Sequence, residues 1–234
     1  MGIDTLLYAF FGGLLPAIIW LYFLLKEDSR CPEPRKMIWL AFVIGMLAVP
    51  LVLIPEKWAQ EALGAGVPVW TAWATIEELA KYVVAAIFIL PRRPVDESPD
   101  YVIYMLTVAL GFAAAENALF LLGPLADGGL LAGVVTENLR FVGATLLHVL
   151  ASSAIGFALA FSYRKTPPLR ILFASVGLIL AIVLHTAFNA LIIMGSGTDT
   201  LSAFLLVWSA AVMFFALFEI LKYIRYYRLP KNTC

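Results

Sequence analysis

Seven apolar runs of about 20 residues each dominate this sequence, and a run of that length can cross the hydrocarbon core of a bilayer as a helix. We predict transmembrane helices at residues 5–25, 37–55, 67–90, 101–122, 138–163, 170–194 and 201–223. Because 62% of the 234 residues are hydrophobic, a soluble domain could not hide the apolar surface. The predicted fold class is therefore all-α, a polytopic membrane bundle with about seven transmembrane helices that forms one domain over residues 1–234.

The basic residues predict the orientation of this bundle. Of the 16 lysines and arginines, 13 fall in the first, third and fifth connectors or at the C-terminal end. Lysine and arginine concentrate on the cytoplasmic side of membrane helices, so we expect the N-terminus outside and the C-terminus in the cytoplasm. The segment 222–228 is basic and aromatic, which predicts an interfacial anchor or a contact with anionic lipid. We expect no nucleic acid as a partner.

Charged and titratable side chains nevertheless lie inside four consecutive predicted spans. A charged group in the middle of a bilayer costs at least a few kcal/mol, so such groups usually serve chemistry or transport. With a rise of about 1.5 Å per residue, the carboxylates and imidazoles among them fall roughly 9–15 Å below the outer surface. These residues are Glu77, Glu78, Lys81, Glu116, His148 and His185. Their common depth predicts one polar layer in the outer half of the membrane.

Local spacing adds detail to this layer. Lys81 follows Glu77 by four residues and Glu78 by three, so its ammonium can neutralise either carboxylate along one helix face. His185 and Asn189 are also four residues apart and share a face. Asn117 or a single histidine, taken alone, could serve only to hydrogen-bond neighbouring helices. Small residues such as Gly111 surround the layer and either permit close helix packing or leave room for a substrate.

Three carboxylates and one lysine leave two excess negative charges when the histidines are neutral, and a low-dielectric site needs relief from that excess. Protonation or a divalent cation would provide it, and two imidazoles with carboxylates suit zinc. Both arrangements lead to hydrolysis, because a glutamate can take a proton from water and histidine or asparagine can stabilise an oxyanion. A proton-coupled transporter and a bis-histidine haem site are alternative interpretations of the same residues.

Four short motifs resemble those of the PrsW family of intramembrane proteases. The segment 77–81 matches the family's EExxK signature, and 112–117 resembles its FxxxEN element. His148 and the segment 185–189 resemble its later histidine motifs. The agreement extends from about residue 67 to 194. The resemblance implies an integral protein of a prokaryotic plasma membrane that cleaves single-span membrane proteins, such as anti-sigma factors, near their extracytoplasmic side.

A more distant similarity links this family to the CAAX prenyl endopeptidases and the bacteriocin-processing membrane proteases, whose motifs are EExxxR, FxxxH and HxxxN. Lys81 stands one position before their arginine, and Ala144 replaces the phenylalanine of FxxxH. The resemblance implies the following roles. Glu77 activates water, Glu78 supports it, His148 positions the water, and His185 with Asn189 polarises the scissile carbonyl, while Lys81 and Asn117 support these residues.

The resemblance allows two interpretations, one with a metal ion in the site and one without. Family members are described both as glutamate-dependent and as metalloproteases, so one zinc ion is a possible cofactor. The predicted ligand set is Glu78, Glu116, His148 and His185. Glu116 has no counterpart in the prenyl endopeptidase pattern, and its negative charge is what makes a metal plausible. A non-catalytic membrane scaffold, by analogy with the scaffold subunit of gamma-secretase, and a proton-coupled transporter remain the alternative functions.

Overall fold

The computed structural model describes residues 2–27, 31–193 and 197–228. This part of the chain forms seven α-helices and no strand, which confirms the all-α prediction. The helices are α1 (Ile3–Glu27), α2 (Arg35–Leu63), α3 (Val67–Phe88), α4 (Ser98–Val142), α5 (Ala144–Ser162), α6 (Pro167–Ile193) and α7 (Gly197–Arg228).

Six of these helices are long and apolar enough to cross a membrane. The exception is α3, whose 22 residues include Glu77, Glu78 and Lys81. Large apolar side chains cover the outside of the molecule, among them Leu51 and Val212, which are 65% and 70% exposed. A surface of this kind needs lipid around it, and the chain is therefore an integral membrane protein.

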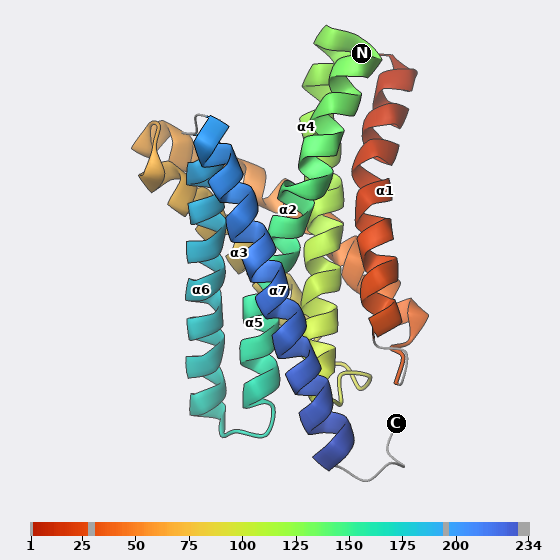
Figure 1. The fold of residues 1–234 in the computed structure, drawn as a ribbon, viewed down its shortest axis with the longest axis vertical. Helices are drawn as coiled ribbons and strands as arrows, with labels where there is room; N and C mark the ends of the chain where they lie inside the picture. Colours follow the sequence, from red (N-terminus) through yellow and green to blue (C-terminus); the bar gives the residue numbers. More distant parts are fainter. Residues whose placement is uncertain (1, 28–30, 194–196, 229–234) are drawn as a thin grey trace.

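Helix α4 forms the centre of the bundle. Every residue from 101 to 114 is buried, because α1, α2 and α5 pack around this part of the helix. Figure 1 shows the backbone of α4 reversing direction at the tip of the bundle and returning toward α5. The predicted connector 123–137 is thus helical, since helical hydrogen bonds satisfy the backbone of this largely apolar stretch without water. The predicted span 138–163 is interrupted only at Gly143, between α4 and α5.

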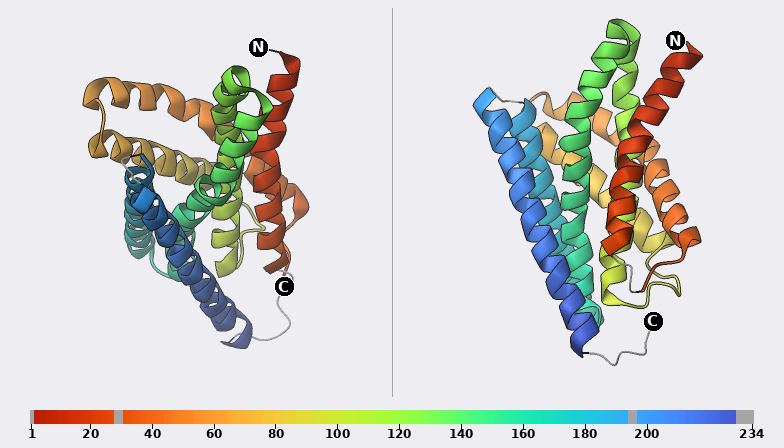
Figure 2. Two further views of the ribbon diagram at one scale, coloured as in Figure 1. Left: turned by 45° about the horizontal axis from the view of Figure 1, so that its top comes forward. Right: turned by 45° about the vertical axis from the view of Figure 1, so that its right-hand side comes forward.

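Helix α2 continues beyond its predicted end at residue 55. Pro50 and Pro55 lie within the helix, and α2 ends only at Leu63. A proline bends a helix without necessarily ending it, because the freed carbonyl can find another partner. In Figure 2 the C-terminal part of α2 and the whole of α3 run at a steep inclination to α1 and α4. This hairpin brings Glu56, which the predicted boundary left in a connector, onto a helix beside α3.

Close helix contacts at glycine explain how α2 approaches the centre. A Cβ atom on Gly111 would clash with the backbone of Phe42, and one on Gly45 would clash with the backbone around Val108. The two helices therefore pack backbone against backbone at these positions. The small residue Gly111 serves packing between α2 and α4, which decides between the two interpretations that the sequence left open for this position.

Candidate active site

The polar side chains predicted to share one layer meet inside the bundle. They come from α3, α4, α5 and α6, which the chain folds side by side. Glu78 and Lys81 are fully buried, and His148 and His185 are each 2% exposed. Glu77 is 5% exposed. Buried charges are tolerated only when partners offset the loss of water, so the contacts of each group define its state.

Lys81 lies at the centre of this cluster. Its Nζ atom is 2.7 Å from Oε1 of Glu78 and 2.8 Å from Nδ1 of His148. The same atom lies 3.5 Å from Oε2 of Glu77 and 4.3 Å from the centre of the Phe112 ring. The lysine therefore links α3 to α5 and lies close to both carboxylates of the pair, as its spacing along α3 predicts.

The contact with Lys81 fixes the proton on His148. An ammonium group has only donors, so Nδ1 of the imidazole must accept. A neutral ring then carries its proton on Nε2, which lies 2.8 Å from Oε2 of Glu116 on α4. The result is a chain of hydrogen bonds that runs from Lys81 through His148 to Glu116 and joins three helices.

Glu78 has a complete set of partners. Its Oε1 atom accepts from Lys81 and lies 3.0 Å from Nδ1 of His185, and its Oε2 atom accepts from the Ser152 hydroxyl at 2.8 Å. Because the carboxylate can only accept, Nδ1 of His185 is the donor and Nε2 of a neutral His185 ring keeps its lone pair. Glu78 therefore acts as the structural member of the carboxylate pair.

Glu77 differs from its neighbour. Its buried Oε2 atom has no hydrogen-bond partner among the described residues. This oxygen lies 3.8 Å from Nδ1 of His148 and 3.9 Å from Nε2 of His185. A buried carboxylate oxygen without a donor, flanked by two imidazoles, is ready to accept a hydrogen bond from a bound molecule such as water.

A cleft leads to Glu77 from the side of α2. Its volume is about 450 Å³, and its wall combines apolar and aromatic side chains with the carboxylates of Glu56, Glu77 and Glu116. The indole of Trp73 donates to the backbone oxygen of Glu56 at 3.1 Å and holds α3 against α2 at this wall. The cleft thus places a space of this size beside the Glu77 side chain, whose Oε2 atom is itself buried.

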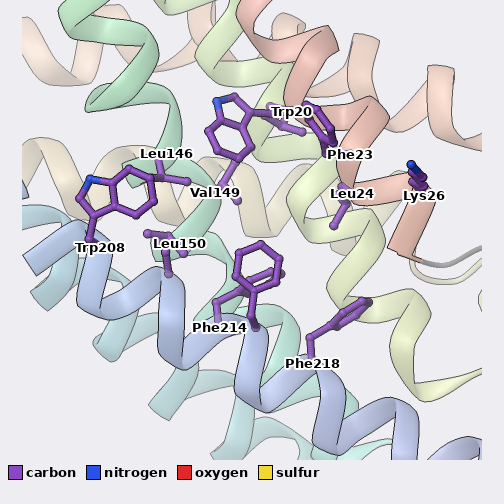
Figure 3. Close-up of a pocket in the computed structure, with 13 residues that line it drawn as sticks. Trp20, Phe23, Leu24, Lys26, Leu146, Val149, Leu150, Trp208, Phe214 and Phe218 are labelled. Atoms are coloured by element: carbon purple, nitrogen blue, oxygen red, sulfur yellow. The ribbon is translucent and has the colours of Figure 1, made fainter.

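A second cavity, of about 460 Å³, lies between α1, α4, α5 and α7. Figure 3 shows that tryptophan, phenylalanine and aliphatic side chains surround it, with Lys26 at its edge. Among the side chains that the structure describes, its lining contains no carboxylate, imidazole or hydroxyl group. Apart from Lys26, the described lining of this cavity therefore offers no group for acid–base chemistry, whereas the cleft beside Glu77 contains three carboxylates.

The residues of this site lie within a region of the chain that matches a known protein family. The model of the "PrsW family intramembrane metalloprotease" matches residues 33–218, which include all of the polar layer. The chain belongs to the PrsW family. It is therefore an intramembrane protease of a prokaryote, as the resemblance of its motifs predicts.

Curated PrsW proteases resemble this chain over most of its length. Protease PrsW of Bacillus subtilis is 26% identical over 181 residues, covering 76% of this chain and 79% of the relative. Protease PrsW of Geobacillus kaustophilus is 31% identical over 150 residues, covering 62% of this chain and 63% of the relative. Protease PrsW of Clostridioides difficile is 23% identical over 189 residues, covering 77% of each. No solved structure matches the chain significantly.

The family description raises the question of which PrsW residues here could hold a metal. Glu77, His148 and His185 offer ligand atoms that all lie within 4.8 Å of one another. Ligand atoms of tetrahedral zinc lie about 3.3 Å apart, because each is about 2 Å from the ion. The trio therefore fits zinc after a small contraction. The fit also needs the Lys81 ammonium to leave Nδ1 of His148, which it now contacts at 2.8 Å.

This trio differs from the predicted ligand set. The trio contains Glu77 but not Glu78 or Glu116, and the oxygens of Glu78 accept from three neighbours. Glu116 instead contacts Nε2 of His148. In metal sites of proteases, a carboxylate that accepts from the far nitrogen of a histidine ligand orients that ligand. Glu78 has this relation to His185.

Asn117 and Asn189 have different surroundings in this PrsW structure. Asn117 is fully buried, and its amide donates to the Thr145 hydroxyl at 2.8 Å, which joins α4 to α5 one turn before His148. Asn189 is half-buried one turn beyond His185. Its amide makes no hydrogen bond within the described ranges of the chain. The role of Asn189 toward a scissile carbonyl stays a prediction.

Sequence reasoning missed two residues of the site. Ser152 is fully buried on α5, one turn after His148, and donates to Glu78. Its spacing of four residues from His148 was available as a signal, but a serine in a membrane helix usually bonds its own backbone. Glu56 was missed because the predicted helix ended at Pro55. The direct contact of the His148 and His185 rings, with centres 5.1 Å apart, leaves no space between them for a haem.

Proposed function

We propose that this protease hydrolyses a peptide bond with a water molecule that Glu77 activates. The observation that carries the proposal is that Glu77 lines the cleft while its buried Oε2 atom has no hydrogen-bond donor among the described residues. A general base must lie within hydrogen-bond reach of the proton that it removes, and the reacting water would enter from the cleft and bind beside this oxygen.

Peptide hydrolysis proceeds in two steps. Glu77 takes one proton from water while the oxygen of that water forms a bond to the carbonyl carbon of the peptide. The tetrahedral intermediate then collapses, the C–N bond breaks, and the proton on Glu77 passes to the departing nitrogen. The products are a carboxylic acid and an amine, which exchange a proton to give a carboxylate and an ammonium group, and Glu77 is again ionised.

The neighbouring residues would hold Glu77 in place. Glu78 fixes Lys81 and His185, and Lys81 offsets the negative charge of the carboxylate pair. Nδ1 of His148 and Nε2 of His185 lie 3.8 and 3.9 Å from the Glu77 oxygen, within reach of a water bound there. His185 can donate to the oxyanion only when its ring is doubly protonated, because Nδ1 already faces Glu78. Alternatively, a zinc ion held by Glu77, His148 and His185 would itself activate water and polarise the carbonyl, and Glu77 would then be a ligand in place of the base.

We further propose that the substrate is a single-span membrane protein, of the kind that includes anti-sigma factors. An apolar wall and a volume of about 450 Å³ suit an extended segment at the end of a membrane span. The excess of basic residues in the alternate connectors supports cleavage near the extracytoplasmic side. We also propose that anionic lipid binds the basic segment 222–228, of which residues 225–228 have side chains outside the described part.

Replacement of Glu77 by glutamine tests this function. Glu77→Gln keeps the size of the side chain and removes the base, so cleavage should fall at least about 1,000-fold. The measurement is co-expression with candidate single-span substrates, followed by the masses of the fragments. Glu61→Gln, on the exposed side of α2, is the matched control and should cleave like the wild type. Full activity of Glu77→Gln would remove Glu77 as the base, and a scaffold would show no cleavage in either protein.

A further inference from the structure

We infer that the cleft beside Glu77 selects a substrate with a lysine or arginine side chain close to the scissile bond, and that Glu56 is the residue that recognises it. This inference rests on the proposed function, because it assigns substrate specificity to the same cleft. It concerns a residue outside the family motifs, on a part of α2 that continues past a proline.

The cleft brings three carboxylates together from three helices. Glu56 comes from α2, Glu77 from α3 and Glu116 from α4, and all three line the same space of about 450 Å³. Only 5% of Glu77 is exposed, and its Oε2 atom lacks a hydrogen-bond donor among the described residues. The acidic wall thus includes Glu77, whose Oε2 atom could accept a hydrogen bond from a ligand that has donors.

The positive charges near this wall have other partners. Lys81 is fully buried and contacts Glu78 and His148. Lys57 also lines the cleft, but its Nζ atom lies 3.8 Å from Glu61 and its side chain is 75% exposed. Glu116 faces Nε2 of His148. For Glu56, the described part of the chain offers no hydrogen bond or ion pair to the carboxylate, and the indole of Trp73 contacts only its backbone oxygen.

Carboxylates at an apolar wall are stabilised by a cation that enters with the substrate. The rest of the lining suits a long basic side chain, because Trp73, Phe112 and Phe120 offer aromatic surface for its methylene stem. Lysine and arginine are also the charged residues that flank membrane spans and reach toward their ends. A basic residue beside the span of the substrate would therefore place its charge at Glu56 and its backbone at Glu77.

The test uses the full-length protein in detergent micelles and a set of synthetic peptides. Each peptide carries an apolar span of about 20 residues and a flanking segment that contains the cleavage site. One flanking position at a time holds lysine, norleucine or glutamate, since norleucine keeps the stem of lysine without its charge. The wild type should favour lysine over norleucine about five- to tenfold in kcat/KM at one position. Glu56→Gln should lower that ratio below about twofold, and Glu56→Lys should favour glutamate instead.

Two further variants keep the test decisive. Glu61→Gln lies on the same helix outside the cleft and should retain the preference of the wild type. Glu56→Asp keeps the charge and should retain part of it, even if Glu56→Lys fails to fold. Cleavage without any preference for lysine, or a preference unchanged in Glu56→Gln, overturns the inference and leaves the proposed function standing. If no peptide is cleaved in a Glu77-dependent way, the proposed function and the inference fail together.

Discussion

Lys81 on α3 and His148 on α5 meet inside the bundle, with Nζ of the lysine 2.8 Å from Nδ1 of the histidine. The same ammonium contacts Glu78 at 2.7 Å. One side chain thus orients the imidazole and neutralises a carboxylate that has no access to water. Lys81 of the EExxK motif therefore offsets the charge of Glu78 on its own helix. It also determines which ring nitrogen of His148 on α5 carries the proton.

Replacement of Lys81 by methionine should destabilise the fold. Methionine has a similar length, but it leaves Glu78 buried without a cation, and breaking a buried ion pair in this way costs about 3–5 kcal/mol. Thermal unfolding in detergent measures the effect, and cleavage should be lost as well. Lys57→Met removes a lysine from the exposed side of α2 and should change the stability by less than about 0.5 kcal/mol. A stable Lys81→Met protein would show that protonation of Glu78 replaces the lysine.

The two adjacent glutamates should respond differently to glutamine. Glu78 accepts from Lys81, His185 and Ser152, so Glu78→Gln weakens several charge-assisted hydrogen bonds and should cost about 2–4 kcal/mol. The Oε2 atom of Glu77 has no hydrogen-bond partner among the described residues, so Glu77→Gln should stay within about 1 kcal/mol of the wild type. Unfolding free energies of the two variants, measured side by side, separate structural and chemical roles. Equal losses of stability would contradict this division.

The Ser152 hydroxyl provides a narrower test of the support around Glu78. Ser152→Ala removes one hydrogen bond to a buried carboxylate and should cost about 1.5–3 kcal/mol. Ser153→Ala is the matched control, because the neighbouring hydroxyl donates only to the Leu150 carbonyl of its own helix and should matter by less than about 1 kcal/mol. The unfolding midpoint in detergent measures both. Similar midpoints for the two variants would show that Ser152 contributes no more than a local backbone bond.

The sequence predicts the polar layer better than it predicts the paths of the helices. The depths of Glu77, His148 and His185 follow from a fixed rise per residue, so their convergence could be predicted once the spans were placed. The course of α2 could not, because a proline inside an apolar run can end, bend or merely interrupt a helix, and tertiary packing selects among these outcomes. That uncertainty is why the sequence did not indicate Glu56.

The partners of each carboxylate were also beyond prediction. Spacing shows that Lys81 can reach either Glu77 or Glu78, but the choice depends on where α5 and α6 lie. The structure packs Ser152 and His185 against Glu78, so that Glu77 keeps the oxygen without a donor. The ligand set with Glu78 and Glu116 stays a prediction, and the geometry adds Glu77 as a candidate ligand beside the two histidines.

Metal content can be measured without reference to activity. If Glu77, His148 and His185 hold zinc, protein purified without a histidine tag should contain about one zinc per chain. Glu77→Gln and His185→Ala should each lower the content below about a tenth of an equivalent, while Ser153→Ala should leave it unchanged. Elemental analysis gives the numbers directly. A wild-type protein without zinc whose cleavage resists chelators would leave Glu77 to act without a metal.

The contact of α2 with α4 explains why the cleft depends on a glycine. Gly111 lies against the backbone of Phe42, and an added Cβ atom there has no flexible neighbour to displace. Gly111→Ala should therefore push α2 outward and cost about 1–3 kcal/mol or more. Since α2 also carries Glu56, the substrate preference should weaken along with the stability. Gly123→Ala is the control on the same helix, because its Cβ atom would meet nothing within 4 Å. Unfolding midpoints and cleavage of the lysine and norleucine peptides test both effects, and a Gly111→Ala protein with the stability of Gly123→Ala would show that the two helices do not pack this closely in the membrane.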